Sequence, residues 1–148
     1  MLENIMVREW MTSPVVSVTP STPISSAHQM MKEYNIRRLP VVDEDRLVGI
    51  VTLGDVREAS PSDANSLSIW ELNYLWAQLT VDRVMTRRVV TVKPEALILD
   101  AAAMMYEHKI GGLPVVGNDD RLVGIVTESD VFKMLIESRS KAIMPKAT

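Results

Sequence analysis

The stretch Gly49-Ile50-Val51-Thr52-Leu53-Gly54-Asp55 has a second copy later in the chain, Gly124-Ile125-Val126-Thr127-Glu128-Ser129-Asp130. In each copy two β-branched residues follow the Gly and fit a buried strand, after which the Thr begins a helix. The Gly has no side chain, so a ligand or another backbone can approach the strand closely. The Thr and the Asp stand three residues apart, which brings a hydroxyl and a carboxylate together at the N-terminus of the helix.

Two interpretations of this Thr and Asp pair are open at this point. One is structural: the Thr caps the helix and the acid sits in its first turn. The other is a polar site for a ligand. Single matches to Thr-x-x-Asp are common and favour the cap. The duplication of everything around the pair favours a role beyond capping.

The duplication extends over most of the chain. Met11-Thr12 returns as Met85-Thr86, and Leu39-Pro40-Val41-Val42 returns as Leu113-Pro114-Val115-Val116, in both cases 74 residues later. The separation is 75 residues between Asp55 and Asp130, so one residue has been inserted in between. The insertion falls in a polar stretch, residues 43–45 in the first copy and 117–120 in the second, whose residue types are typical of hairpin turns.

Each copy predicts the order strand, helix, strand, turn, strand, helix. The β-branched run at residues 15–18 is the first predicted strand. Ser21, Thr22 and Pro23 then predict a helix start, with Ser or Thr as the cap. The helix after it has one apolar face in each copy, formed by Ala27, Met30, Met31 and Tyr34 in the first and by Ala101, Met104, Met105 and His108 in the second. The methionines are interpreted as core filling.

These patterns predict four segments: a first repeat at residues 7–59, a linker and connector helix at 60–80, a second repeat at 81–136 and a C-terminal tail at 137–148. The linker is polar over residues 60–66, and residues 67–79 predict a helix that carries Trp70 and Trp76. Apolar residues occupy more than one face of this helix. It is either buried within one chain or also in contact with a second subunit, where aromatic residues are enriched.

Composition narrows the class of protein. The chain has 148 residues, 47% of them hydrophobic, and a net charge of −3 with both signs mixed along it. This length suits one domain or a pair of half-domains, and the charge pattern does not resemble a nucleic-acid-binding surface. The chain has no cysteine and no apolar run of membrane-spanning length. A soluble cytoplasmic protein is therefore expected.

Catalysis is not expected from these residues. An enzyme would need a nucleophile with its base, a metal cluster or an acid–base pair. His28 and His108 lie in predicted helices without acidic or histidine neighbours at ligand spacing, so no metal site is predicted. Asp55 and Asp130 belong to opposite repeats and are not expected to form a catalytic pair.

The repeated motifs resemble those of the tandem CBS domain family, also called the Bateman module. The resemblance rests on Met-Thr ahead of the first strand, Leu-Pro-Val-Val, and Gly-Ile-Val-Thr-x-x-Asp, each present twice in the same order between residues 7 and 136. The connector at residues 71–75 is similar to that of bacterial stand-alone CBS pairs, including those of the acetoin-utilisation type.

The resemblance implies a fold, a ligand class and a partner. The implied fold is of the mixed α/β (α+β) class, with two β-α-β-β-α repeats packed sheet to sheet about a pseudo-twofold axis. Family members bind adenosine-containing ligands in the clefts between repeats: AMP, ADP, ATP, S-adenosylmethionine, NAD or cyclic dinucleotides. They bind them as regulatory ligands, so no obligatory cofactor is implied. Two modules commonly pair into a flat homodimer, and a sensor of this kind needs an effector protein.

The same resemblance assigns site residues. Asp55 with Thr52, and Asp130 with Thr127, match the positions that accept hydrogen bonds from the ribose hydroxyls, a task that suits a carboxylate. The implied adenine walls come from apolar side chains at Val15, Val16, Ile36, Val89, Val90 and Ile110. The family pattern combines Asp130 with Val15 and Ile36, and Asp55 with Val89 and Ile110.

The phosphate-binding positions differ between the copies. The first copy has Arg37 and Arg38 ahead of Leu-Pro, whereas the second has Gly111 and Gly112. Arginine suits phosphate recognition. The sequence leaves two alternatives: Arg87 and Arg88 compensate for the glycines, or one site binds no charged group. Two equivalent nucleotide sites are therefore not expected.

The leading hypothesis is a regulatory module that binds an adenosine-containing ligand and changes conformation in response. The alternative is a module without a ligand that serves structure or protein interaction. Because packing alone would accept other caps, the presence of Thr and Asp in both copies favours ligand binding.

Overall fold

The chain forms two compact units whose boundaries differ from those of the sequence repeats. The computed structural model describes residues 2–59 and 69–143. The first unit contains residues 16–89, and the second unit contains residues 1–15 together with 90–148. The first residues of each repeat, 7–15 and 81–89, therefore belong to the unit built around the other repeat.

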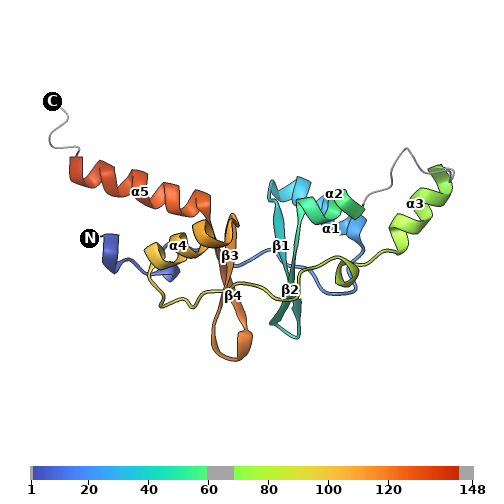
Figure 1. The fold of residues 1–148 in the computed structure, drawn as a ribbon, viewed down its shortest axis with the longest axis horizontal. Helices are drawn as coiled ribbons and strands as arrows, with labels where there is room; N and C mark the ends of the chain where they lie inside the picture. Colours follow the sequence, from blue (N-terminus) through green and yellow to red (C-terminus); the bar gives the residue numbers. More distant parts are fainter. Residues whose placement is uncertain (1, 60–68, 144–148) are drawn as a thin grey trace. The chain divides into compact units, whose positions relative to one another are not determined.

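The first unit is built on an antiparallel hairpin of β1 (Arg38–Asp43) and β2 (Arg46–Thr52). Its helices are α1 (Ile24–Tyr34), α2 (Leu53–Ala59) and α3 (Ile69–Gln78), with a 3₁₀ turn, η3, at Val81–Arg83. Figure 1 shows α1 and α2 beside the hairpin. The core between them is aliphatic, with Ile24, Leu39 and Val51 fully buried.

The second unit repeats this design with β3 (Gly112–Val116) and β4 (Leu122–Thr127). Helices α4 (Ile98–His108) and α5 (Glu128–Ile143) pack beside the hairpin (Figure 1). The 3₁₀ turns η1 (Leu2–Asn4) and η2 (Val7–Glu9) lie in the N-terminal segment, and η4 (Asn118–Asp120) lies in the hairpin loop. Ile98, Leu113 and Met134 are fully buried in its core.

The two hairpin turns confirm the predicted insertion site. Glu44 and Asp45 have φ values of 51° and 66°, and Asp119 and Asp120 have 57° and 61°. Asp tolerates this left-handed region better than most residues, which suits Asp45, Asp119 and Asp120 to these turns. The mixed helix and strand class is likewise confirmed by the two small sheets. The sheet-to-sheet packing of the two repeats stays a prediction.

The predicted first strand of each repeat is wrong as a regular strand. Residues 15–17 have no strand partner, and only Val18 forms a bridge, parallel to Val41. The amide of Val18 donates to the carbonyl of Pro40 at 3.0 Å, and the amide of Val42 donates to the carbonyl of Val18 at 2.8 Å. Val92 makes the equivalent bridge to Val115. One bridge per repeat is enough to hold the segment but leaves a two-stranded sheet.

The predicted Ser or Thr cap of α1 is also wrong, because the N-cap is Pro23 and its counterpart in α4 is Leu97. The first helical amides are satisfied by carbonyls from elsewhere in the same unit. The amide of Ile24 donates to Leu79 at 2.9 Å, and the amide of Ile98 donates to Ile5 at 2.8 Å.

Two other predictions need correction. Tyr34 and His108 do not extend the buried helix faces, since both are exposed at the last turn before Asn35 and Lys109 reverse the chain in the left-handed conformation. The C-terminal tail predicted from residue 137 is helical as far as Ile143, because α5 continues beyond the repeat.

The predicted linker at residues 60–66 lies outside the described residues, whereas the connector helix is present as α3.

The lead-in segments, defined as residues 7–14 and 81–88, complete the units. Thr12 pairs with Ile125 in the second unit through backbone hydrogen bonds of 2.8 and 3.0 Å. Thr86 pairs with Ile50 in the first unit through bonds of the same two lengths. The residue before each Thr is a methionine, and its sulfur lies against a strand glycine.

The glycines are required by this contact. A Cβ on Gly49 would lie 2.6 Å from Sδ of Met85 and 3.0 Å from the Thr86 carbonyl oxygen. A Cβ on Gly124 would lie 2.5 Å from Sδ of Met11. Both distances are far shorter than van der Waals contact, so any side chain would push the lead-in segment away. The close approach inferred from the sequence is thus made by backbone and methionine of the same unit.

We expect Gly49→Ala to destabilise the protein by about 1–3 kcal/mol, the usual cost of overpacking a filled site. The matched control is Gly54→Ala. Gly54 is exposed in α2, its Cβ would come no closer than 3.6 Å to Thr52 Oγ1, and Ala is the better helix former. Urea unfolding of both variants checks the prediction. Equal stability of the two variants would contradict it.

His28 lies edge-on to Trp76, with ring centroids 6.1 Å apart, in the first unit. Burial lowers the pKa of His28 below 6.5, and the positive charges of Lys32 and Arg57 lower it further. The folded state therefore binds this proton more weakly than the unfolded state does. The resulting stability is present above pH 6.5 and is lost as the pH falls through the unfolded and then the folded pKa.

We expect the free energy of unfolding to fall more steeply between pH 7.5 and pH 5.5 in the wild type than in His28→Gln. Gln keeps a polar side chain at this position but cannot titrate. Urea unfolding at the two pH values measures the difference. Parallel pH dependences in the two proteins would show that His28 does not carry this effect.

Candidate functional site

Each unit presents one capping arrangement of Thr and Asp at the start of the helix that follows its hairpin. In the first unit the amide of Thr52 donates to Oδ2 of Asp55 at 2.9 Å, and the amide of Asp55 donates to Oγ1 of Thr52 at 3.2 Å. In the second unit the same two bonds join Thr127 and Asp130 at 2.9 and 3.4 Å. The structural interpretation of the motif is therefore correct, since this is a reciprocal capping box.

The cap uses only part of each carboxylate. Among the described residues, the hydrogen bonds of Asp55 and Asp130 to their Thr involve Oδ2 and leave Oδ1 without a partner. Within the same residues, the one buried side-chain polar atom without a hydrogen bond is Nε1 of Trp76. Oδ1 of each Asp therefore reaches the surface, where it can accept a hydrogen bond from a ligand.

The first unit brings the arginine pair to this cap. Arg38 pairs with Thr52 across the hairpin, and the amide of Leu53 donates to the Arg37 carbonyl at 2.7 Å. Arg37 is exposed and Arg38 is half-buried. In the first copy, the residues predicted to bind the ribose and those predicted to bind the phosphate are thus held next to one another by backbone pairing.

The second unit has the same backbone arrangement without the positive charges. Gly112 pairs with Thr127, and the amide of Glu128 donates to the Gly111 carbonyl at 3.0 Å. Arg87 and Arg88 belong to the first unit, which already contains Arg37 and Arg38. Both are exposed, and Arg87 donates to the Asp82 carbonyl at 3.2 Å. Arg87 and Arg88 therefore belong to the same unit as Arg37 and Arg38, whereas the second unit has glycines at the positions of Arg37 and Arg38.

The predicted apolar walls are divided between the units. The first unit contains Val16, Ile36 and Val89, whereas the second contains Val15, Val90 and Ile110. All six side chains are half-buried. Val16 and Ile36 pack against the core of the first unit, and Val90 and Ile110 pack against that of the second. All six side chains still offer apolar surface, as a wall for a flat ring requires.

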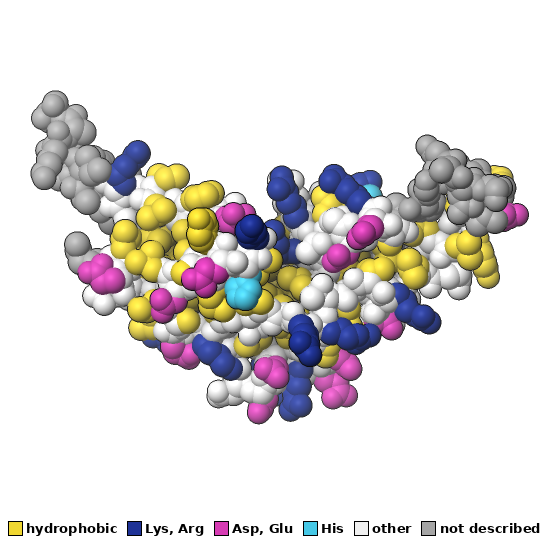
Figure 2. All heavy atoms as spheres, in the orientation of Figure 1, with side chains coloured by type: hydrophobic (Ala, Val, Ile, Leu, Met, Phe, Trp, Pro, Cys, Tyr) yellow, Lys and Arg dark blue, Asp and Glu magenta, His cyan; other side chains and the backbone are white. Residues whose placement is uncertain are grey.

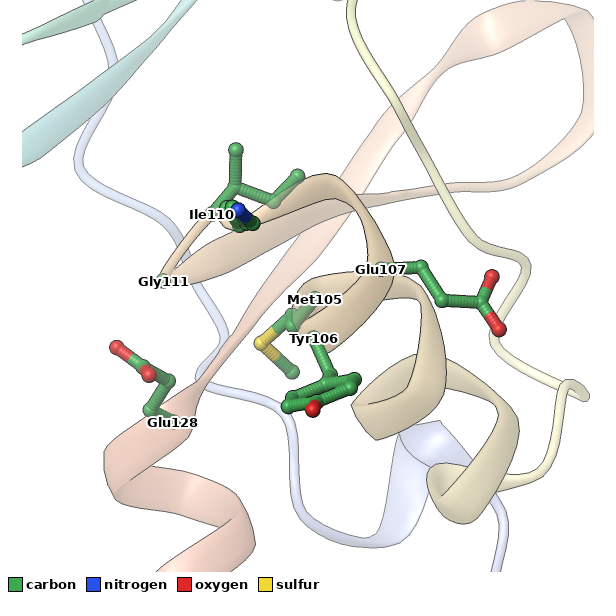
Figure 3. Close-up of a pocket in the computed structure, with 7 residues that line it drawn as sticks. Met105, Tyr106, Glu107, Ile110, Gly111 and Glu128 are labelled. Atoms are coloured by element: carbon green, nitrogen blue, oxygen red, sulfur yellow. The ribbon is translucent and has the colours of Figure 1, made fainter.

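A hollow beside the second cap was not predicted. Its volume is about 520 Å³, within the range of small-molecule pockets. It is lined by Met105, Tyr106, Glu107, Lys109, Ile110, Gly111 and Glu128. Figure 3 shows that these residues come from the end of α4, the turn after it and the start of α5. Ile110 and Gly111 were expected at a site. Tyr106 belongs to no motif, and Glu128 is a variable position of the motif that ends at Asp130.

Other kinds of site are not seen in the described residues. Residues 2–59 and 69–143 contain no group of three or more His, Asp or Glu side chains that could hold a metal ion. Within the same ranges, no helix has both the length and the hydropathy needed to cross a membrane.

Comparison with known families identifies the fold. The family described as "CBS domain" matches residues 7–62 and again residues 81–137. The chain therefore belongs to the CBS domain family and contains a pair of these domains.

The most similar relatives include the uncharacterized protein MJ1225 of Methanocaldococcus jannaschii, 33% identical over 138 residues. That alignment covers 88% of this chain and 47% of the relative. The chain spans less than half of the length of the curated relatives that match first.

Similar solved structures include three CBS pairs. The CBS domain pair of MJ0100, solved with 5′-methylthioadenosine and S-adenosylmethionine, has a TM-score of 0.74 at 29% identity and covers 90% of this chain and 97% of that one. CBSX2 of Arabidopsis thaliana, solved in complex with AMP, has a TM-score of 0.77 at 29% sequence identity. The match covers 91% of this chain and 98% of CBSX2. A proposed acetoin utilisation protein, AcuB from Vibrio cholerae, has a TM-score of 0.77 at 30% sequence identity. The match covers 97% of this chain and 98% of AcuB. The recognition of a CBS domain pair, with AcuB among the similar structures, is thus confirmed.

The capping box predicts distinct effects for two substitutions of Asp55. Asp55→Asn keeps an oxygen for the Thr52 amide, so we expect stability close to that of the wild type. Asp55→Ala removes the acceptor and should cost about 1 kcal/mol, as loss of a cap usually does. Chemical unfolding measures both variants, and Asp130→Asn and Asp130→Ala repeat the comparison in the second unit. A loss that is as large for Asn as for Ala would contradict this account of the cap.

Proposed function

We propose that this chain is a cytoplasmic regulatory module that binds an adenosine-containing ligand and catalyses no reaction. The observation that carries the proposal is the free, surface-reaching Oδ1 of Asp55 and of Asp130, held in place by the cap. A ribose cis-diol needs acceptors, and a carboxylate oxygen makes stronger hydrogen bonds than a neutral one. The AMP complex of CBSX2 and the S-adenosylmethionine complex of MJ0100 support this ligand class.

The residues ahead of Leu-Pro differ between the two caps, which favours a different ligand at each. Arg37 and Arg38 adjoin the Thr52 cap, so this position suits a phosphate group. The Thr127 cap adjoins Gly111 and Gly112, and the hollow beside it carries Glu107 and Glu128 against the single Lys109. We therefore propose that phosphorylated nucleotides bind at the first unit and that the second unit takes an adenosyl ligand without phosphates.

Binding is proposed to change the arrangement of the module and to be reported to an effector protein, with two copies of the chain forming a homodimer. A ligand can shift such an equilibrium only as far as its affinity differs between the two states. Small-angle scattering with and without saturating ligand tests this step. Identical scattering curves would remove the conformational part of the proposal and leave the binding part standing.

The test of binding is a thermal-shift series with AMP, ADP, ATP, S-adenosylmethionine, NAD and cyclic dinucleotides. A ligand at 100 times its Kd stabilises the folded state by about 2.7 kcal/mol, so we expect Tm to rise by several degrees and to depend on concentration. Adenosine and inorganic phosphate alone are the controls for the two halves of the ligand.

Asp55→Asn is the matched variant for this test, because the cap keeps its acceptor while the group that faces the ligand changes from an oxygen acceptor to an NH₂ donor. Loss of one charge-assisted hydrogen bond should raise Kd roughly 10- to 100-fold. Asp130→Asn shows whether the second unit binds the same ligand. If no compound shifts the Tm of the wild type, the interaction-module alternative replaces this proposal.

A further inference from the structure

The hollow beside the second cap combines an aromatic wall with a carboxylate. Figure 3 shows Met105 and Tyr106 on one side of it and Glu128 on the other, whereas the carboxylate of Glu107 is directed away from them. Tyr106 is 85% exposed, so its ring is available to a bound molecule. An aromatic ring and a carboxylate on opposite sides of one space suit a cation, which the ring attracts through its face and the carboxylate through its charge.

The charge around the hollow is negative. Glu107 and Glu128 stand against Lys109, which leaves a formal charge of −1 among the lining residues. Figure 2 shows acidic side chains over the region where α4 ends and α5 begins. The start of a helix otherwise favours an anion, but at α5 the carboxylate of Glu128 already supplies that negative charge. A phosphate in this hollow would therefore be repelled, whereas a positive group would be attracted.

The first unit provides an internal comparison, because duplication gives it the same elements. The positions equivalent to the charged, aromatic and glycine lining residues are occupied there by Lys32, Glu33, Asn35, Arg37 and Leu53. The formal charge at these positions is +1, against −1 around the hollow. Leu53 begins α2 as Glu128 begins α5, so the capping box does not require an acid at this position. The fold therefore leaves this residue free to serve another purpose.

The hollow adjoins the proposed ribose position of the second unit. Glu128 lies two residues before Asp130 in the first turn of α5, and its amide donates to the Gly111 carbonyl at 3.0 Å. In a nucleoside, the 5′ carbon is three bonds from the 3′ oxygen. When the ribose hydroxyls bind Oδ1 of Asp130, the 5′ substituent is therefore the part of the ligand that lies near the neighbouring residues of this turn.

We propose that the hollow takes a positively charged 5′ substituent of an adenosyl ligand, such as a sulfonium, and that Glu128 is the residue that selects it. Tyr106 contributes through the face of its ring. The inference rests on the proposed function, because it needs an adenosyl group at the Asp130 cap. It goes further by making positive charge a condition for tight binding at the second unit.

The test is calorimetric titration of the full-length Asp55→Asn protein, in which binding at the first cap is weakened and the second unit dominates the signal. Three ligands differ at the 5′ end. S-adenosylmethionine has a sulfonium, S-adenosylhomocysteine has nearly the same size without that charge, and AMP has a phosphate. We expect Kd to rise in this order. The first two should differ at least roughly threefold, as expected for a charge pair and a cation–π contact near a surface.

Adding Glu128→Gln should raise the Kd of S-adenosylmethionine roughly 3- to 10-fold and change that of S-adenosylhomocysteine less than about twofold. The matched control is Glu107→Gln, which removes the same charge from the same hollow but from a carboxylate directed away from Tyr106. It should keep the preference for the sulfonium. Glu128→Lys should reverse the order and tighten AMP. Circular dichroism and thermal unfolding confirm that the variants fold.

Two results would overturn the inference: an unchanged preference in Glu128→Gln, or an equal loss of preference in Glu107→Gln, which would reduce the effect to long-range charge. Either result leaves adenosyl binding at the second unit standing. If neither these three ligands nor adenosine binds to the wild type or to any variant, the proposed function fails and this inference fails with it.

Discussion

The backbone pairing of each lead-in segment with a strand of the other repeat is the constraint on which the rest of the structure depends. Hairpins β1–β2 and β3–β4 have two strands each, and two strands are rarely stable alone. Thr86 pairs with Ile50 of β2, and Thr12 pairs with Ile125 of β4. Each lead-in segment therefore covers part of the open edge of a hairpin. Val81 and Val7, in the same segments, are fully buried in the two cores. Each unit therefore needs residues from the start of the other repeat.

The Thr and Asp pairs serve folding as caps, and their geometry is compatible with the proposed role in ligand recognition. The capping box fixes the rotamer of the Asp, because both its amide and its Oδ2 are held by the Thr. A carboxylate fixed by the fold loses little side-chain entropy when a ligand binds. The capping role of the motif is thus compatible with the proposed binding role.

Much of the fold was predictable because it depends on local patterns. The repeats, the hairpins and the helices follow from apolar periodicity and turn residues, and a resemblance carried by three repeated motifs gave the family. The strand at residues 15–18 was overpredicted, since β-branched residues also suit an extended segment held by one bridge. The N-caps of α1 and α4 were missed because their amides bond to carbonyls distant in the sequence. Membership of Arg87 and Arg88 in the first unit depends on the exchange of lead-in segments, which no local pattern encodes.

The exchanged lead-in segments also bear on how such a chain could arise. A protein with a single repeat has one lead-in segment and one open strand edge, and the two cannot be joined in the way seen here without a second repeat. Two separate copies could satisfy each other by trading these segments, as in a domain-swapped dimer. Gene duplication followed by fusion would then convert an exchange between two molecules into one within a single molecule. The glycine beneath each methionine would be inherited from that ancestral contact, twice in the same chain.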